Sequence, residues 1–142
     1  MKKILLISFT LLSFCFFSQS SDHSSREKSL PSIELKDMKG KTVNISELGL
    51  DGPIVISFWA TWCSPCKKEL NTINEVYQDW QDETGVTLVA VSIDDSKTKN
   101  NVPIYVNGKG WEYVVLMDPN GDLKRAMGVN NVPHTFLVNK EG

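Results

Sequence analysis

The sequence predicts a single domain of the α/β class, and three observations support this prediction. Apolar runs that are typical of buried strands cover residues 54–59 and 86–93. Between these runs, apolar side chains recur at helical spacing at Leu70, Ile73, Val76, Tyr77 and Trp80. The chain has 142 residues, of which 41% are hydrophobic, so it is long enough for one domain with its own core.

The overall charge does not point to a particular partner. The formal net charge is −2, and no basic stripe indicates binding to nucleic acid. Three cysteines are present, Cys15, Cys63 and Cys66, and Cys15 lies in an N-terminal apolar run. Removal of that run would leave only the closely spaced pair.

Residues 1–20 have the pattern of a secretory signal peptide. Two lysines follow the first residue, residues 4–17 are almost entirely apolar, and small residues precede the expected cleavage after position 20. An uncleaved N-terminal membrane anchor is one alternative. A lipoprotein acylated at Cys15 is another, although Phe14 argues against it. Export bears on function, because disulfides are made, broken and exchanged in the cell envelope.

Residues 21–30 are rich in serine and charge and predict a flexible linker, in which His23 is simply solvated. The domain itself is expected to cover residues 31–142. No internal repeat is visible in the sequence.

A small β-hairpin is predicted at the start of the domain. Residues 33–35 and 42–45 alternate between apolar and polar residues, and a turn signal separates them. Ser46 is expected to cap one helical turn. Gly52 and Pro53 then break the chain before the first buried strand.

The remaining chain alternates helices and strands. The long helix is expected to begin at the first cysteine of the pair and to end at Gly85. Within residues 96–110 we expect only a short or broken helix, because Pro103 and Gly108 weaken a continuous one. Further elements are expected at 114–117 (strand), 118–121 (turn), 123–127 (short helix), 135–138 (strand) and 139–142 (start of a hairpin turn).

The chemistry of the chain is concentrated in Cys63 and Cys66, which lie where the strand at 54–59 gives way to the helix. A helix that begins at Cys63 would favour its thiolate, because backbone N–H groups and the helix dipole attract negative charge. We therefore expect Cys63 to attack a disulfide and Cys66 to resolve the mixed disulfide that forms. A structural disulfide, or part of a metal site with His134 as a further ligand, is the alternative.

Residues 58–69, which read FWATWCSPCKKE, resemble the active-site segment of the thioredoxin superfamily. The Val132–Pro133 pair before the last predicted strand strengthens the likeness. It runs from about Pro31 to the end of the chain and is nearest to the bacterial envelope TlpA/ResA-like thiol–disulfide oxidoreductases. The resemblance implies a thioredoxin-like fold with an added N-terminal β-hairpin.

The resemblance also implies roles for residues around the cysteines. The bond between Val132 and Pro133 would be cis and would face the disulfide, so that the Val132 backbone could pair with an extended substrate. Ser64 and Pro65 would tune the reduction potential. Trp62 would offer a flat apolar surface to the substrate, with simple packing as the alternative.

Two positions depart from the family pattern. Ser57 stands where many thioredoxins have a buried acid, whereas ResA-like members place a glutamate at the end of the next strand. Asp95, or its neighbour Asp94, matches that position and could accept a proton during resolution, with helix capping or solvation as the alternative. His134 could favour the Cys63 thiolate when protonated, and an ordinary exposed histidine is the alternative.

The family continues beyond the position that matches Gly142, with a partner strand and a closing helix. We therefore expect the last strand and helix to be missing and the domain at residues 31–142 to be incomplete at its C-terminus. An uncovered sheet edge of this kind favours aggregation. It also puts the activity of the chain in question.

Together these observations predict an exported thiol–disulfide oxidoreductase that reduces envelope protein disulfides, as in c-type cytochrome maturation. Its redox group would be the Cys63–Cys66 disulfide, with no metal and no other cofactor. Its partners would be protein thiols and disulfides and an upstream membrane electron donor, in the periplasm or cell envelope, with membrane contact only through the N-terminus. The alternatives are a disulfide oxidase or isomerase, a Cys/His metal-binding module, and an inactive truncated remnant.

Overall fold

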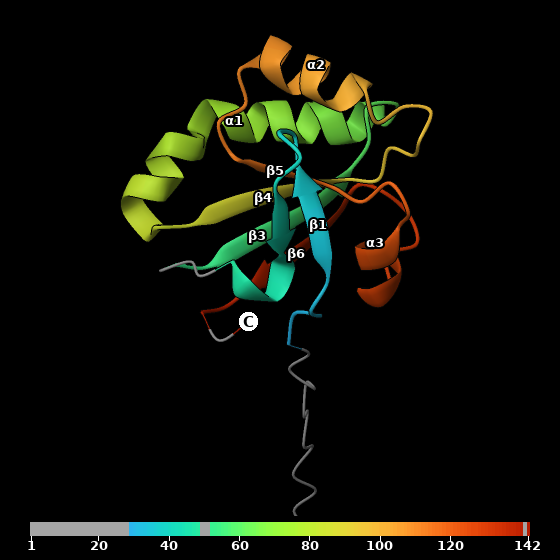
Figure 1. The fold of residues 1–142 in the computed structure, drawn as a ribbon. Helices are drawn as coiled ribbons and strands as arrows, with labels where there is room; N and C mark the ends of the chain where they lie inside the picture. Colours follow the sequence, from blue (N-terminus) through green and yellow to red (C-terminus); the bar gives the residue numbers. More distant parts are fainter. Residues whose placement is uncertain (1–28, 49–51, 141) are drawn as a thin grey trace, which may run out of the picture.

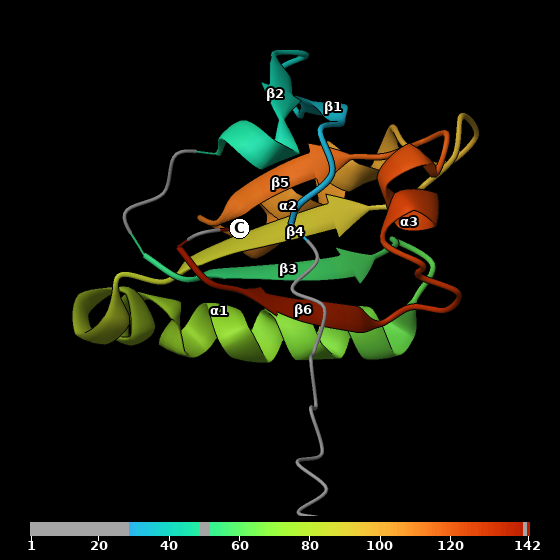
Figure 2. The same cartoon turned by 90° about the horizontal axis from the view of Figure 1, so that it is seen from below.

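The computed structural model describes residues 29–48, 52–140 and 142. The predicted leader at 1–20 and all but the last two residues of the predicted linker at 21–30 lie outside the described residues. Among the described residues, none of the helices combines the length and the apolar character needed to cross a bilayer. Most of the elements are labelled in Figure 1, and β2 is labelled in Figure 2. They are β1 (Glu34–Asp37), β2 (Thr42–Asn44), η1 (Ile45–Glu47), β3 (Ile54–Trp59), α1 (Ser64–Thr84), β4 (Thr87–Ser92), α2 (Asn101–Lys109), β5 (Val114–Met117), α3 (Asp122–Ala126) and β6 (His134–Val138).

A mixed six-stranded sheet in the order β2-β1-β5-β4-β3-β6 organises the domain, and Figure 2 shows this order. The strands β3, β4 and β5 are parallel. The strand β6 pairs antiparallel with β3, and the β1–β2 hairpin joins antiparallel to β5 at the opposite side. The predicted α/β class and the predicted hairpin are therefore confirmed. Because three strands run parallel, their carboxyl ends meet at one edge of the sheet, where sites form in such folds.

Helices cover both faces of the sheet (Figures 1 and 2). On one face α1 and α2 pack over a core cluster that includes Leu70 and Val106. On the other face η1 and α3 pack over a second cluster that includes Ile45 and Leu123. Successive strand residues point to opposite faces, so each central strand contributes side chains to both clusters.

The long helix α1 begins and ends where the sequence predicts. Cys63 is its N-cap, and Pro65 lies in the first turn, where a missing N–H removes no helical bond. Gly85 ends the helix in the left-handed conformation, with a φ of 67°, and its N–H donates to the Gln81 carbonyl. A Cβ on Gly52 would collide with the Gly85 carbonyl, so these two segments approach each other closely beside β3.

Two local details qualify the sequence prediction. The helix α2 is short, as expected, but it is continuous despite Pro103 and Gly108. Pro103 fits because it lies in the first turn, where the N–H groups have no helical partner, and Gly108 lies in the last turn. The prediction that Ser46 caps the first helical turn is wrong. The cap is Asn44, whose side chain accepts a hydrogen bond from the Ser46 N–H at 3.1 Å.

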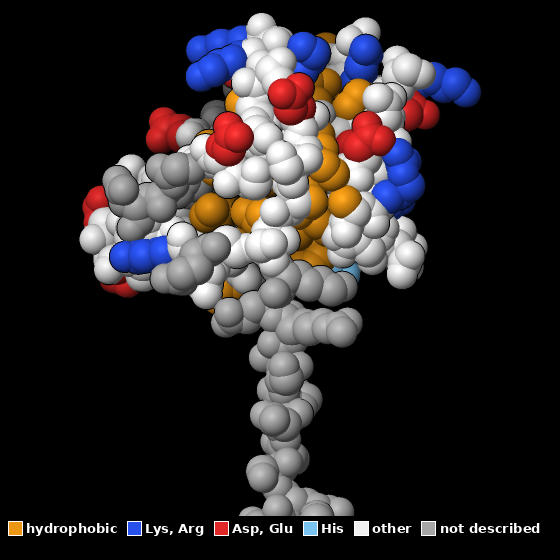
Figure 3. Space-filling view, turned by 60° about the horizontal axis from the view of Figure 1, so that its bottom comes forward, with side chains coloured by type: hydrophobic (Ala, Val, Ile, Leu, Met, Phe, Trp, Pro, Cys, Tyr) orange, Lys and Arg blue, Asp and Glu red, His pale blue; other side chains and the backbone are white. Residues whose placement is uncertain are grey.

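Apolar side chains reach the surface on the face that carries η1 and α3. Figure 3 shows them as a strip across the middle of this face. Partly buried residues that pack against the cluster on this side include Ile33, Val43, Met127 and Phe136. This face is opposite to α1, the helix whose first turn carries the cysteines.

Candidate active site

Cys63 and Cys66 lie at the edge where the parallel strands end, between β3 and the first turn of α1. The structure joins them as a disulfide, with their Cα atoms 5.3 Å apart. Cys63 is 5% exposed and Cys66 is 1% exposed. Cys63 is thus the more accessible of the two residues, which suits the predicted role of the attacking sulfur.

The start of α1 gives the Cys63 sulfur a polar environment. The Cys66 N–H donates a hydrogen bond to the Cys63 Sγ at 3.3 Å. The first N–H groups of a helix and the positive end of its dipole favour negative charge. After reduction of the disulfide, these groups would stabilise a thiolate on Cys63, which is the nucleophilic form.

A buried carboxylate holds the loop that leads into Cys63. Asp94 is 1% exposed and accepts hydrogen bonds from the Thr61 N–H at 2.8 Å and the Thr61 hydroxyl at 2.5 Å. The Ser92 hydroxyl donates to the same carboxylate at 2.8 Å. These bonds tie the end of β4 to the residue two positions before Cys63. Asp94 therefore positions the start of the cysteine loop.

Asp95, the predicted proton acceptor, carries its carboxylate on the surface. It accepts hydrogen bonds from the N–H groups of Lys97 at 2.9 Å and Thr98 at 3.2 Å. These bonds, chiefly the one from Lys97, hold the pKa of Asp95 below its ordinary value. Asp95 therefore caps a turn that precedes α2, whose own N-cap is Asn100, and its exposed side chain agrees with the solvated alternative. Of these two neighbouring acids, Asp94 is the one that contacts the cysteine loop.

The peptide bond between Val132 and Pro133 is cis, as the resemblance predicts. Val132 is partly buried and packs against the apolar cluster that contains both cysteines, whereas Pro133 is exposed. The segment before β6 therefore lies against the same cluster as the disulfide. His134 is exposed at the start of β6, with its ring 4.7 Å from the ring of Phe136. This placement fits the ordinary exposed histidine.

Glu69, which the sequence pattern does not mark as a site residue, contacts the strand β6 in the structure. Its carboxylate accepts a hydrogen bond from the Thr135 hydroxyl at 3.2 Å. The Thr135 hydroxyl also lies 3.5 Å from the hydroxyl of Ser57, the position where many thioredoxins have an acid. Glu69 follows Cys66 by three residues, and residues at this spacing share a helix face. That spacing is the signal that could have identified it.

Aromatic side chains support the site from the side of α2. Trp59 is fully buried, with its ring 4.8 Å from that of Trp111 and 5.9 Å from that of Tyr105. Trp62 is 60% exposed, so it presents the predicted apolar surface rather than packing into the core. The Nζ of Lys67 lies 5.4 Å from the centre of the Tyr105 ring, within cation–π range.

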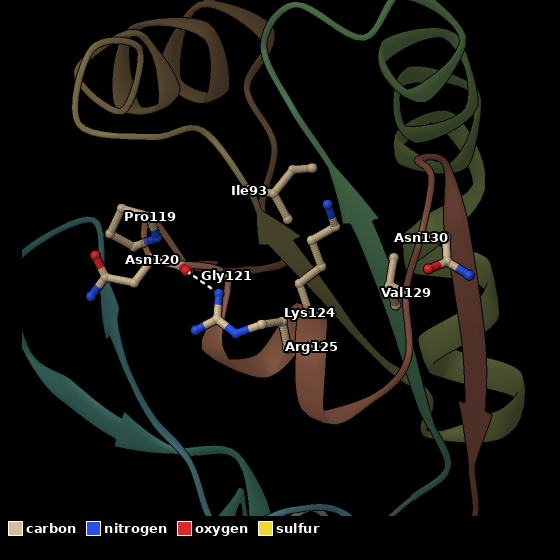
Figure 4. A pocket seen from close by; sticks show the side chains of 8 residues that line it. All are labelled: Ile93, Pro119, Asn120, Gly121, Lys124, Arg125, Val129 and Asn130. Atoms are coloured by element: carbon tan, nitrogen blue, oxygen red, sulfur yellow. Dashed lines mark hydrogen bonds between the residues drawn. The ribbon is translucent and has the colours of Figure 1, made fainter.

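A polar cavity of about 430 Å³ lies at the carboxyl end of β4, between α3 and the segment before β6. Figure 4 shows the Lys124 side chain extending from α3 between Ile93 and Val129. The Arg125 guanidinium donates to the Asn120 carbonyl at 2.6 Å. Ile93 connects the cavity to the site, because it packs against the cluster that contains both cysteines.

A cysteine pair at the first turn of a helix, on a mixed sheet with helices on both faces, defines the class of thioredoxin-like thiol–disulfide oxidoreductases. The chain belongs to the AhpC/TSA family, whose model matches residues 27–142.

Curated relatives carry the name of the same activity. The chain is 32% identical over 139 residues to the thiol-disulfide oxidoreductase ResA of Bacillus subtilis (strain 168), a match that covers 98% of this chain and 74% of the relative. It is 31% identical over 136 residues to ResA of Bacillus thuringiensis (strain Al Hakam), covering 96% of this chain and 75% of the relative. The protein is accordingly an enzyme of thiol–disulfide exchange.

Solved structures confirm the thioredoxin-like fold. An uncharacterized thioredoxin-like protein from Porphyromonas gingivalis is 51% identical, with a TM-score of 0.71, over 80% of this chain and 75% of that one. A putative thiol:disulfide interchange protein DsbE from Chlorobium tepidum is 26% identical, with a TM-score of 0.70, over 81% of this chain and 78% of that one. The resemblance stated from the sequence is therefore confirmed at the level of fold and enzyme class.

Proposed function

We propose that this protein is exported to the periplasm or cell envelope, where it reduces disulfides of protein clients, including the apoproteins of c-type cytochromes. The observation that carries the proposal is the Cys63 Sγ at the start of α1, where it accepts the Cys66 N–H. The signal-like pattern of residues 1–20 supports export. The likeness to the TlpA/ResA-like group supports the choice of clients.

The reaction begins with the pair in its reduced form. The Cys63 thiolate attacks one sulfur of the client disulfide, so that a bond from Cys63 to the client forms and the client S–S bond breaks. The second client sulfur leaves as a thiolate and takes a proton from water. Trp62 and the Val132–Pro133 segment hold the client chain beside the sulfur.

Cys66 then completes the exchange. Its thiol gives up a proton, for which Glu69 on the same helix face is the proposed acceptor. The Cys66 sulfur attacks the Cys63 Sγ, forms the disulfide of the structure and releases the other client sulfur, which is protonated by water. Two electrons have then passed from the enzyme to the client. An upstream membrane-bound dithiol donor returns two electrons to the pair, so no other cofactor takes part.

A redox titration of the purified chain in glutathione and dithiothreitol buffers tests the direction of transfer. Tryptophan fluorescence can follow the titration, because Trp59 and Trp62 lie within a few residues of the pair in the sequence. We expect a single two-electron transition near or below about −250 mV, as for known thiol reductants. A potential near about −120 mV would instead indicate a disulfide-forming oxidase.

Cysteine variants test the assigned roles and the remaining alternatives. Cys66→Ser should accumulate a mixed disulfide with a client, whereas Cys63→Ser should form none.

Metal analysis after purification under reducing conditions tests the alternative of a Cys/His metal-binding module. In the described part of the chain, no three His, Cys, Asp or Glu side chains gather as such a site requires. A cooperative unfolding transition would argue against an inactive remnant.

A further inference from the structure

A groove of about 400 Å³ lies between the cysteine loop and α2. Its lining consists of Thr61, Trp62, Thr98, Asn101, Ile104 and Tyr105. Two of the lining side chains are large, apolar and mostly exposed, Trp62 at 60% and Ile104 at 72%. Trp62 directly precedes Cys63, so one wall of the groove is formed by the residue next to the reactive cysteine.

Hydrogen bonds fix both walls of this groove in place. On the side of the cysteine loop, the Asp94 carboxylate holds the N–H and the hydroxyl of Thr61. On the side of α2, the Tyr105 hydroxyl accepts a hydrogen bond from the Asn71 amide at 3.1 Å, and the Trp111 Nε1–H donates to the Asn71 amide oxygen at 2.9 Å. A groove with rigid walls loses little entropy when a ligand binds, which favours affinity.

Apolar contact, rather than charge, decides what the groove can bind. None of the six lining residues is itself charged. Charged groups of both signs contact them: the Lys67 ammonium lies above the Tyr105 ring, and the carboxylates of Asp94 and Asp95 accept hydrogen bonds from two lining threonines. An apolar side chain would gain from contact with Trp62 and Ile104, whereas the mixed charges favour neither a cation nor an anion.

We propose that this groove binds a bulky apolar side chain of the client polypeptide, next to the client cysteine that exchanges with Cys63. The inference rests on the proposed function and adds a sequence preference to it. Ile104 is a specificity-determining residue in this arrangement. We expect the client segment to be extended, with the apolar residue close to its disulfide. The apolar side chain can then enter the groove while the disulfide lies at Cys63.

Three cyclic disulfide peptides test the preference. They are identical except that leucine, serine or lysine stands on both sides of one cysteine. The measured quantity is the second-order rate constant with which each peptide oxidises the reduced full chain. Tryptophan fluorescence detects the reaction. We expect the leucine peptide to react about tenfold faster than the serine peptide, because part of a leucine side chain leaves water. The lysine peptide should react no faster than the serine peptide, because its charged end does not benefit from the apolar contacts.

Two variants locate the preference on the surface. Ile104→Ser should reduce the leucine-to-serine ratio of rate constants to about threefold or less. Leu137→Ser, which changes an apolar side chain that is 79% exposed on β6, should keep the ratio of the wild-type protein. The ratio of the two rate constants does not depend on the fraction of folded protein. A variant that is only less stable would therefore keep the wild-type ratio.

Several results would overturn the inference. Equal rate constants for the leucine and serine peptides would show that the groove selects nothing. The same loss of ratio in Leu137→Ser would assign the preference to apolar surface in general. A preference that appears only on dilution, together with dimers in sedimentation, would show that a second copy of the chain occupies the groove. No reaction with any of the peptides would contradict the proposed function itself, and with it the role of the groove.

Discussion

The Asp94 carboxylate accepts hydrogen bonds from both the backbone N–H and the hydroxyl of Thr61, at 2.8 and 2.5 Å. Asp94 follows β4, and Thr61 lies in the loop between β3 and Cys63. A polar group that is 1% exposed is stable only when it is well hydrogen-bonded, and the Ser92 hydroxyl supplies a third donor. The carboxylate therefore fixes the cysteine loop relative to the sheet.

Replacement of this carboxylate should weaken both the fold and the reaction. Asp94→Asn replaces one carboxylate oxygen with an NH2 group, which cannot accept from the Thr61 and Ser92 donors. We expect the free energy of unfolding to fall by about 1–3 kcal/mol, because buried polar groups lose their partners. The rate of exchange with a model disulfide should also fall, because the loop before Cys63 loses its anchor. Urea unfolding and stopped-flow fluorescence measure the two effects.

Asp79→Asn provides the matched control for this variant, since Asp79 is an exposed acid on α1. It should change the free energy of unfolding by no more than about 0.5 kcal/mol. If Asp94→Asn behaved like this control in both measurements, the anchoring role of Asp94 would be refuted.

The contrast between Asp94 and Asp95 shows where sequence reasoning reached its limit. The strand and helix patterns, the cysteine pair and the Val-Pro pair identified the fold and the edge of the sheet that carries the site. Side chains alternate between faces along a strand, but the alternation cannot be extended reliably past the last paired residue, Ser92. The sequence could therefore not say which of two adjacent acids turns inward. In the structure, Asp94 turns inward and accepts from Thr61, whereas Asp95 turns outward and accepts from Lys97.

Glu69 illustrates a second limit. Its contact with Thr135 joins residues 66 positions apart in the chain, and hydrophobic periodicity says nothing about such a contact. The position on α1 was predictable from the helix, but the register of β6 against β3, which pairs Thr135 with Ser57, was not. Polar contacts between elements depend on this register, which the turn and apolar patterns of the sequence specify only in part.

The Glu69 carboxylate should speed the resolving step by accepting the Cys66 proton. Glu69→Gln keeps the shape of the side chain and its capacity to accept from Thr135, but it cannot take a proton from Cys66. We expect the rate of resolution at pH 7 to fall at least about tenfold. Single-turnover kinetics at pH 7 measures this step. Glu75→Gln, a change to an exposed acid on the same helix, is the control. Equal rates of resolution for Glu69→Gln and wild type would exclude a role in proton transfer.

Substitutions at Gly52 and Gly108 should have opposite effects on stability, because only Gly52 lies against another part of the backbone. Gly52→Ala would push a Cβ into the Gly85 carbonyl, so the free energy of unfolding should fall by about 1–3 kcal/mol. Gly108→Ala adds a Cβ in open space within α2, and it should raise the free energy of unfolding by about 0.5 kcal/mol. Urea denaturation of both variants checks the signs. A neutral Gly52→Ala would mean that the segment before β3 can move away from the helix end.

The turn cap at Asp95 predicts a stability difference that depends on pH. The N–H groups of Lys97 and Thr98 lower the folded-state pKa of this carboxyl below the ordinary value of 3.8. A depressed folded-state pKa stabilises the fold above the unfolded-state pKa, and this stabilisation is lost as the pH falls through the folded-state value. Wild type should therefore be more stable than Asp95→Asn at pH 7, and the difference should shrink steadily as the pH is lowered from 5 towards 2. Urea unfolding of both proteins across this range tests the prediction, and a difference that stayed constant with pH would contradict the charged cap.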